Sequence, residues 1–428
     1  MQGVRRSFWK SFGPGLLFAG AAVGVSHQVQ STRAGAGYGL GLIGVVLLAN
    51  LLKYPAFRFG SHYAAATGTS LLEGYRRQGK LVLGLYALLT LGTMFTVTAA
   101  VTVVTAGLLG LLLGVQGHPI ALSAVLLAAC GGLLAVGRFA WLDRVIKVVV
   151  AVLTVSTVAA AALALPRIDF AQASFWPDLA QWTRADFAFA AALVGWMPSA
   201  VDIAVWQSLW TLAKRDATGG SKSAAMDVRA VLLDFDIGYI GTALLAVCFV
   251  LLGAAVMFGK GVAPAASAGG FAAQIVSLYA GTLGAWSAPL IGGAAFAVML
   301  STTLTVVDGF PRAIAVLVQR FGRAEQAGEL DLEQGEGRRA YWSALVVLAI
   351  GSLFVLALLL KTLAALVDLA TTLSFLSAPV LAWLNHRAAT AVEVPPALRP
   401  GRAMRLLSWL GILFLGAFAL AYLWMRST

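Results

Sequence analysis

Long apolar stretches dominate the chain, and short stretches that carry most of the charges separate them. A helix that crosses a bilayer needs roughly 20 apolar residues, and eleven such stretches can be placed. The pattern therefore predicts an all-α polytopic membrane protein with eleven transmembrane helices in one domain, residues 1–426. The predicted spans lie near residues 13–33, 37–57, 82–114, 119–137, 145–165, 186–212, 231–258, 283–307, 341–360, 364–385 and 404–425.

Two of the predicted spans are interrupted by residues that break helices. The first interruption consists of Gly24, Val25, Ser26 and His27, and the second of Gly195, Trp196, Met197, Pro198 and Ser199. Pro198 removes a backbone donor and clashes with the preceding turn, so it breaks or kinks its helix. Irregular backbone at bilayer depth is tolerated only where it lines a cavity or is buried in protein. Paired breaks therefore predict a substrate site, whereas a kink needed only for packing is the alternative at each position.

The two breaks stand at matching positions in the two halves of the chain. If residues 13–165 and 186–387 are repeats of five spans, each repeat begins with a broken helix. The odd number of spans places the repeats in opposite orientations. The sequence thus predicts an inverted 5+5 repeat with one further helix, residues 404–425.

The composition changes this picture only by excluding other classes. The chain is 60% hydrophobic and 11% charged, with a mean hydropathy of +0.87, which excludes an ordinary soluble protein. The net charge of +12 does not indicate a nucleic-acid partner, because 24 of the 30 Lys and Arg residues fall on one side when the N-terminus is placed in the cytoplasm. We therefore expect the lipid bilayer as partner, a bacterial-type inner or plasma membrane, a cytoplasmic N-terminus and an extracytoplasmic C-terminus. The six remaining basic residues are Arg33, Arg167, Arg184, Lys260, Lys361 and Arg426.

Ionisable side chains near the breaks are candidates for function, because charges inside a bilayer are costly. Asp202 follows Ser199 by three residues and precedes Trp206 by four, so on a helix the three would share a face. It is expected to face a wet cavity, to pair with His27 or Arg33, or to be protonated, and a purely structural ion pair is an equal alternative. Thr371 in the tenth span, with threonines of the third span, could line a polar path, and the alternative is that these hydroxyls bond back to their own helices.

The motifs of enzymes and of nucleotide-binding proteins are missing from the sequence. Residues 74–80 (GYRRQGK) resemble the start of a phosphate-binding loop, but Leu81 replaces the required Ser or Thr and no strand precedes them. There is no HExxH, GxSxG or Cys/His cluster, and Cys130 and Cys248 fall inside predicted spans. We expect neither an enzyme nor a cofactor.

Several short motifs of the chain carry a resemblance to a known family. The first two spans carry residues 13–17 (GPGLL), 19–21 (AGA), 35–39 (GAGYG) and 48–51 (LANL), and Met197-Pro198 stands at the second break. These motifs resemble those of the Nramp divalent-metal transporters, in which Met197-Pro198 is similar to the start of the Met-Pro-His signature. The resemblance implies a LeuT-like fold in which a metal ion, usually driven by a coupling proton, binds between broken helices 1 and 6.

The same comparison reveals departures from the family pattern. Gly24, Val25, Ser26 and His27 replace the family's Asp-Pro-Gly-Asn, and Ser199 replaces its His. Val101 and Val104 stand where family members carry acidic residues of the proton route, and Thr371 stands at a family Gln.

Three functions remain open from the sequence. The first is a secondary transporter, working as a symporter, that still carries a divalent metal on a rearranged ligand set of His27, Met197 and Asp202, where imidazole and thioether favour a transition metal. The second is a transporter of an organic or anionic substrate that uses Ser26, Ser199 and backbone groups. The third is a membrane sensor that has kept the fold without transport. A His27–Asp202 pair would sense protons.

Overall fold

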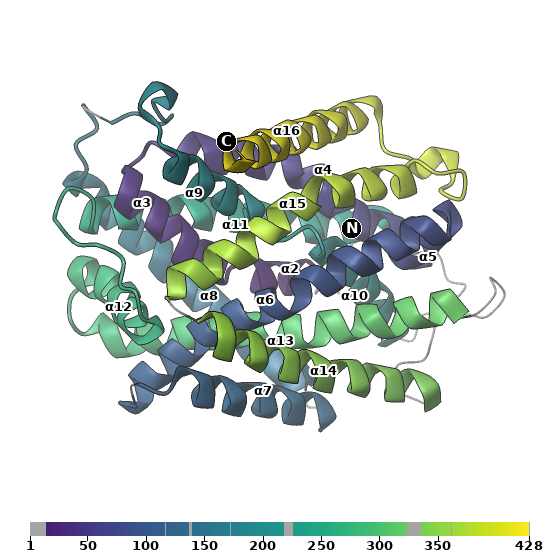
Figure 1. The fold of residues 1–428 in the computed structure, drawn as a ribbon, viewed down its shortest axis with the longest axis horizontal. Helices are drawn as coiled ribbons and strands as arrows, with labels where there is room; N and C mark the ends of the chain where they lie inside the picture. Colours follow the sequence, from purple (N-terminus) through teal and green to yellow (C-terminus); the bar gives the residue numbers. More distant parts are fainter. Residues whose placement is uncertain are drawn as a thin grey trace, which may run out of the picture.

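The computed structural model describes residues 14–115, 117–136, 139–171, 173–217, 226–322, 335–360 and 362–427. All regular elements in these ranges are helices, and Figure 1 shows their arrangement. In chain order they are α2 (Pro14–Ala22), η1 (Ser26–Ser31), α3 (Thr32–Tyr38), α4 (Ile43–Thr67), α5 (Leu71–Gln78), α6 (Lys80–Leu113), α7 (Pro119–Ala135), α8 (Phe139–Ala164), η2 (Leu165–Arg167), η3 (Leu179–Gln181), α9 (Arg184–Gly195), α10 (Ile203–Ala217), α11 (Val228–Val256), α12 (Ala268–Leu283), α13 (Ser287–Gly322), α14 (Gly335–Leu359), α15 (Leu363–Ala389), η4 (Pro396–Leu398) and α16 (Arg402–Ser427).

The helices confirm the predicted all-α membrane architecture. Within the described ranges, seven of them are long and apolar enough to cross a bilayer, namely α4, α6, α11, α13, α14, α15 and α16. The shorter helix α7 and residues 151–167 are also apolar. The total of eleven spans stays a prediction. The sequence did not predict α12, and it ended the eighth span at residue 307, whereas α13 continues through Pro311 to Gly322.

Both predicted helix breaks are present. The first separates α2 from η1, which is a π-helical turn of six residues, and α3 continues the same span. The second separates α9 from α10 by the seven non-helical residues 196–202. Neither half of a broken helix is long enough to cross a bilayer alone, so the breaks lie inside the bundle.

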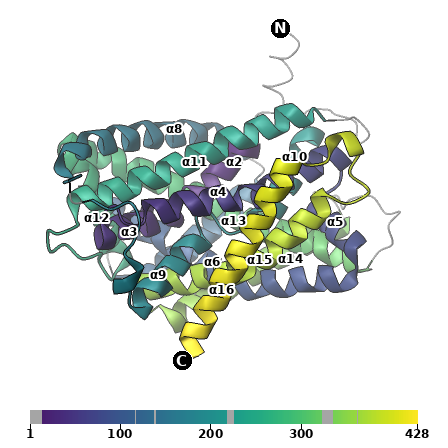
Figure 2. The same cartoon turned by 90° about the horizontal axis from the view of Figure 1, so that it is seen from above.

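The broken helices occupy the centre of the bundle. In Figure 1, α16 runs along one edge and α7 and α14 along the opposite edge, with α2 between them. Figure 2 shows α8 and α11 side by side along one face. Small residues let the central helices touch: a Cβ added to Gly35 of α3 would lie 2.0 Å from the carbonyl oxygen of Val250 in α11, and one added to Gly60 of α4 would lie 2.1 Å from that of Ala204 in α10. Such close backbone contact is the usual way in which membrane helices associate.

One basic residue of the predicted cytoplasmic set is buried inside the bundle. Lys53 is on α4 and is fully buried, so it belongs to the interior of the bundle and gives no information about topology. An ammonium can be buried when all its hydrogen bonds are satisfied. The following basic residues of the predicted cytoplasmic set lie outside the described residues: Arg5, Arg6, Lys10, Arg138, Lys222 and Arg323.

Candidate functional site

The two helix breaks face each other across a small cavity of about 30 Å³. Val25 and Ser26 line it from the first break, and Trp196 and Ser199 from the second. Most of the remaining lining is apolar, and the polar groups among the lining residues are three hydroxyls and two indoles. The other lining residues are Ala21, Val97, Val101, Ala200, Ile203, Trp206, Thr302, Val306 and Phe310.

The first break depends on a small residue beside α13. A Cβ added to Gly24 would lie 2.7 Å from the Cγ2 atom and 2.8 Å from the Oγ1 atom of Thr302. The Thr302 hydroxyl donates to the carbonyl of Gly20 at 2.8 Å, which holds α13 against α2. Gly24 is therefore a packing residue at the break, where a larger side chain would displace Thr302.

His27 does not line the cavity. Its Nδ1 atom lies 2.7 Å from the Ser26 hydroxyl, and its Nε2 atom lies 2.9 Å from the carbonyl oxygen of Thr242 in α11. The Ser26 hydroxyl also donates to the carbonyl of Ala22 at 2.6 Å. The imidazole thus ties the π-helical turn to α11, and both of its nitrogens are occupied.

Asp202 lies apart from His27, so the predicted pair between them is not formed in this structure. The carboxylate is almost fully buried, and its Oδ2 atom accepts from the Thr93 hydroxyl of α6 at 3.5 Å. Its Oδ1 atom has no hydrogen-bond partner among the described residues. The carboxylate therefore has only one long contact to offset its burial.

The expected shared face of Ser199, Asp202 and Trp206 is also wrong. Ser199 and Trp206 line the cavity, whereas Asp202 does not. The expectation assumed a continuous helix, but α10 begins only at Ile203. Spacings of three and four residues place side chains on one face only within a helix.

The carbonyls released by the second break are bound by a lysine. Lys53 of α4 donates to the carbonyl oxygens of Val194, Gly195 and Ser199, each at 2.9 Å. Met197 is fully buried and is not among the residues that line the cavity, and the Trp196 indole donates to Ser374 of α15 at 2.8 Å. The break is thus held by α4 on one side and by α15 on the other.

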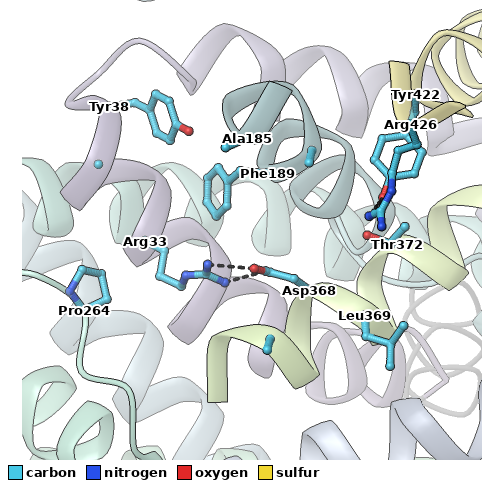
Figure 3. Close-up of a pocket in the computed structure, with 13 residues that line it drawn as sticks. Arg33, Tyr38, Ala185, Phe189, Pro264, Asp368, Leu369, Thr372, Tyr422 and Arg426 are labelled. Carbon is cyan, nitrogen blue, oxygen red and sulfur yellow. Dashed lines mark hydrogen bonds and ion pairs between the residues drawn. The ribbon is translucent and has the colours of Figure 1, made fainter. Parts of the chain in front are cut away.

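A second, larger cavity of about 640 Å³ opens at the end of the bundle where α3, α9, α15 and α16 meet. Figure 3 shows Arg33 of α3 and Asp368 of α15 joined at its floor. The pair is bidentate, with Nη1–Oδ1 and Nη2–Oδ2 distances of 2.6 and 3.0 Å. Gln30 donates to the same carboxylate and to the Thr371 hydroxyl, at 3.2 and 3.4 Å. Thr371 is therefore linked to the pair through Gln30, and its carbonyl packs against Gly195 at the end of α9.

The site predicted from the sequence lacks Lys53 and Asp368, although both residues carry a signal. Both fall inside predicted spans, residues 37–57 and 364–385, where an ionisable side chain is costly and calls for a partner. Lys53 lies near the end of its span, which favours a place among the loop charges, and the structure corrects this. Asp368 could have been matched with Arg33, because both lie near the same predicted membrane surface.

No group of three or more His, Cys, Asp or Glu side chains that could hold a metal ion occurs in the part of the chain that the structure describes. His27 and Asp202 bond to different helices, α11 and α6. Their proposed joint ligation of a metal with Met197 would require a rearrangement of both breaks.

Residues 15–425 match the family model described as natural resistance-associated macrophage protein-like (Nramp). An uncharacterized protein of Pasteurella multocida (strain Pm70) is 34% identical over 429 residues, which cover 99% of this chain and 94% of that protein. The crystal structure of a manganese transporter of Eremococcus coleocola is similar with a TM-score of 0.70 and 15% identity, covering 98% of this chain and 87% of that one. A nucleobase-cation-symport-1 family transporter, solved in a closed conformation, is similar with a TM-score of 0.53 and 13% identity, covering 96% and 91%. At these identities the two structures show a common fold.

Proposed function

This chain belongs to the Nramp family of integral membrane transporters, and we propose that it is a secondary transporter whose substrate binds between the two helix breaks. The cavity lined by both breaks carries this proposal. Discontinuous helices near the bilayer midplane are the usual place for a transporter's substrate. The proposed binding residues are those of the first break, Gly24, Val25, Ser26 and His27, those of the second, Gly195, Met197, Pro198, Ser199 and Asp202, and Thr371.

We further propose that the N-terminus is cytoplasmic and that residues 13–165 and 186–387 form inverted repeats. The basic residues support this orientation. The larger cavity, which is lined by the ends of α3 and α16, then faces the outside, and the Arg33–Asp368 pair separates it from the smaller one. A reporter enzyme that is active only outside the cytoplasm, fused after Thr428, should be active, and an inactive fusion would reverse the orientation.

A divalent metal ion is the first substrate class to test. Family membership supports it, as does the shared fold with the manganese transporter of Eremococcus coleocola. A metal in the present cavity would meet the Ser26 and Ser199 hydroxyls, while His27, Met197 and Asp202 would have to turn toward it. A proton is the coupling ion that we propose, with Asp202 and His27 as the buried ionisable groups near the breaks.

A substrate that carries hydrogen-bond acceptors, such as a small carboxylate, is the second candidate. The indole N–H of Trp206, a residue that lines the cavity, has no acceptor among the described residues. An unpartnered donor favours an oxygen atom of a ligand over a cation. The first break also favours such a substrate. The family's aspartate is replaced there by Gly24, so no negative side chain at the break repels an anion.

A thermal-shift series on the purified protein tests the two substrate classes. Manganese, cobalt and cadmium form one arm, and carboxylates, amino acids and nucleobases form the other. A true ligand at 100 times its Kd stabilises the fold by about 2.7 kcal/mol. The hit is then tested for saturable uptake into proteoliposomes.

Variants of the cavity show whether a hit binds at the proposed site. Ser26→Ala combined with Ser199→Ala should abolish the ligand-dependent stabilisation. The control is Ser277→Ala, whose exposed hydroxyl on α12 bonds only to its own helix among the described residues. An equal response of both variants would mean that the ligand binds elsewhere. If the proteoliposomes show no saturable uptake of either substrate class, the proposed function is wrong.

A further inference from the structure

Lys53 is bound entirely by backbone oxygens of the second helix break. Its ammonium has three donors, and these reach the carbonyls of Val194, Gly195 and Ser199 at 2.9 Å each. The side chain has no exposed surface. Two of the acceptors belong to the last turn of α9, and the third, Ser199, lies within the break at residues 196–202, so one ammonium joins the end of α9 to the non-helical segment.

Charge compensation at Lys53 comes from dipoles. None of the ion pairs in the described ranges involves Lys53, and the nearest ring is that of Phe57, whose centroid lies 5.5 Å from the Nζ atom. The C-terminal end of a helix carries a partial charge of about −0.5 e, concentrated on carbonyls that have no partner within the helix. The end of α9 is such a terminus, and Lys53 neutralises it.

Three converging backbone carbonyls form a cation site. Rings of carbonyl oxygens replace the hydration shell of alkali cations in channels, and half-helix ends coordinate ions in transporters with broken helices. In this chain the oxygens are already occupied by an ammonium that is covalently attached to α4. The cation therefore cannot leave the protein.

We propose that Lys53 is a tethered cation that fills the cation site of the second break, so that no free sodium, potassium or ammonium ion is needed there. A chain without this ammonium would expose a three-carbonyl site that takes a small free cation, with primary alkylammonium ions as the best fit because they donate three hydrogen bonds. The alternative is that Lys53 only fills space, in which case an uncharged side chain of similar volume would replace it.

Chemical rescue of Lys53→Ala tests the proposal. The substitution deletes the atoms of n-propylammonium, so this ion should raise the Tm of the variant saturably. Two compounds serve as controls: 1-propanol has a similar size without charge, and tetramethylammonium has the charge without N–H donors. The wild-type protein should respond to none of the three. Rescue by 1-propanol to the same extent, or no rescue by n-propylammonium, overturns the proposal.

If Lys53→Ala does not fold, a second pair of variants tests whether the charge of Lys53 is required. Lys53→Arg keeps the cation, and Lys53→Met keeps much of the volume without it. We expect the Arg variant to remain folded and the Met variant to lose at least about tenfold in folded yield or uptake, as expected when hydrogen bonds to a charged group are removed. Equal behaviour of the two variants overturns the proposal. The stability readouts need no substrate, so they remain valid even if the proposed function is wrong.

Discussion

Arg33 of α3 and Asp368 of α15 form a bidentate ion pair between the larger cavity and the first helix break. The Arg33 side chain is 14% exposed and that of Asp368 is 37% exposed, so the pair is open to the cavity on one side. Because it links the second half of one broken helix to α15, we expect the two residues to separate when the first break opens toward the larger cavity.

Loss of this ion pair should favour the state that is open to the larger cavity. With a partly exposed pair worth about 1 kcal/mol, Arg33→Gln should increase the labelling rate of a cysteine at Thr371 about fivefold, measured with a membrane-impermeant maleimide after replacement of Cys130 and Cys248. Arg426→Gln is the matched control, because Arg426 lines the same cavity without joining the pair. Identical labelling rates in the two variants would show that the pair is not a gate.

The Asp202→Asn variant should show whether the carboxylate of Asp202 acts in transport or only in the structure. The carboxylate has a single long contact, to Thr93, and a buried charge with so few partners costs stability. The amide has nearly the same shape without the charge, so the Tm should stay equal or rise, while uptake should fall at least about tenfold if the carboxylate acts in transport. Unchanged uptake would assign Asp202 no role in transport.

The sequence predicted the positions of the breaks better than the directions of the side chains around them. Pro198 acts through backbone chemistry, which is local and can be read from the residue itself. The direction of His27 depends on the π-helical turn at residues 26–31, whose hydrogen bonds span five residues, so a helical period of 3.6 assigns its face wrongly. Asp202 precedes the start of α10, where no helical period applies.

The role of Lys53 could not be predicted from sequence spacing. Its three acceptors are backbone carbonyls of residues 194, 195 and 199, far away in the chain. Every residue type has a carbonyl, so no side-chain pattern marks these positions as partners. The position of Lys53 within a predicted span was the one available signal.

His27 should make transport depend on pH through its bond to Ser26. Thr242 and Ala22 offer only carbonyl acceptors, so the imidazole Nε2 must donate to Thr242, and the single Ser26 hydroxyl proton satisfies either Ala22 or the imidazole Nδ1. Only a doubly protonated imidazole satisfies all three contacts at once. The bonding of the first break is thus linked to protonation.

His27→Gln should therefore flatten any pH dependence of uptake, because it removes the titratable group from the first break. The measurement is initial uptake into proteoliposomes at fixed internal pH. His118→Gln, at the exposed N-cap of α7, should keep the wild-type profile. A profile that His27→Gln leaves unchanged would remove His27 from the coupling mechanism.

Glu73, in the first turn of α5, should make the free energy of unfolding depend on pH. Burial alone would raise the pKa of this carboxyl, but hydrogen bonds and charges from Arg76, Arg77 and Arg320 outweigh burial and lower the pKa below its ordinary value of 4.5. A lowered folded pKa gives stability that is complete above the ordinary pKa and is lost as the pH falls through the folded value.

At neutral pH, Glu73→Gln should thus lose about 3 kcal/mol of stability, the usual cost of breaking a buried ion pair. The Tm difference from wild type should shrink as the pH falls below about 4.5, because the wild-type carboxyl is then also neutral. Glu336→Gln, in the exposed first turn of α14, should change the Tm little at any pH. A constant difference across the pH range would mean that Glu73 acts through shape alone.

Gly195 should tolerate no larger side chain, because α9 and α15 touch there. A Cβ at this position would lie 2.2 Å from the carbonyl oxygen of Thr371 and 3.0 Å from the Cβ atom of Phe375. Gly195→Ala must therefore push α15 away from the second break, which should cost about 1–3 kcal/mol of stability as other overpacked sites do. It should also lower uptake, since the shift moves the carbonyl that binds Lys53.

Gly84→Ala on α6 is the matched control, because an added Cβ there meets nothing within 4 Å. Since Ala is favoured over Gly inside a helix by about 0.5–1 kcal/mol, Gly84→Ala should keep or raise the Tm, and a Gly195→Ala protein that behaves in the same way would mean that the contact between α9 and α15 yields without cost.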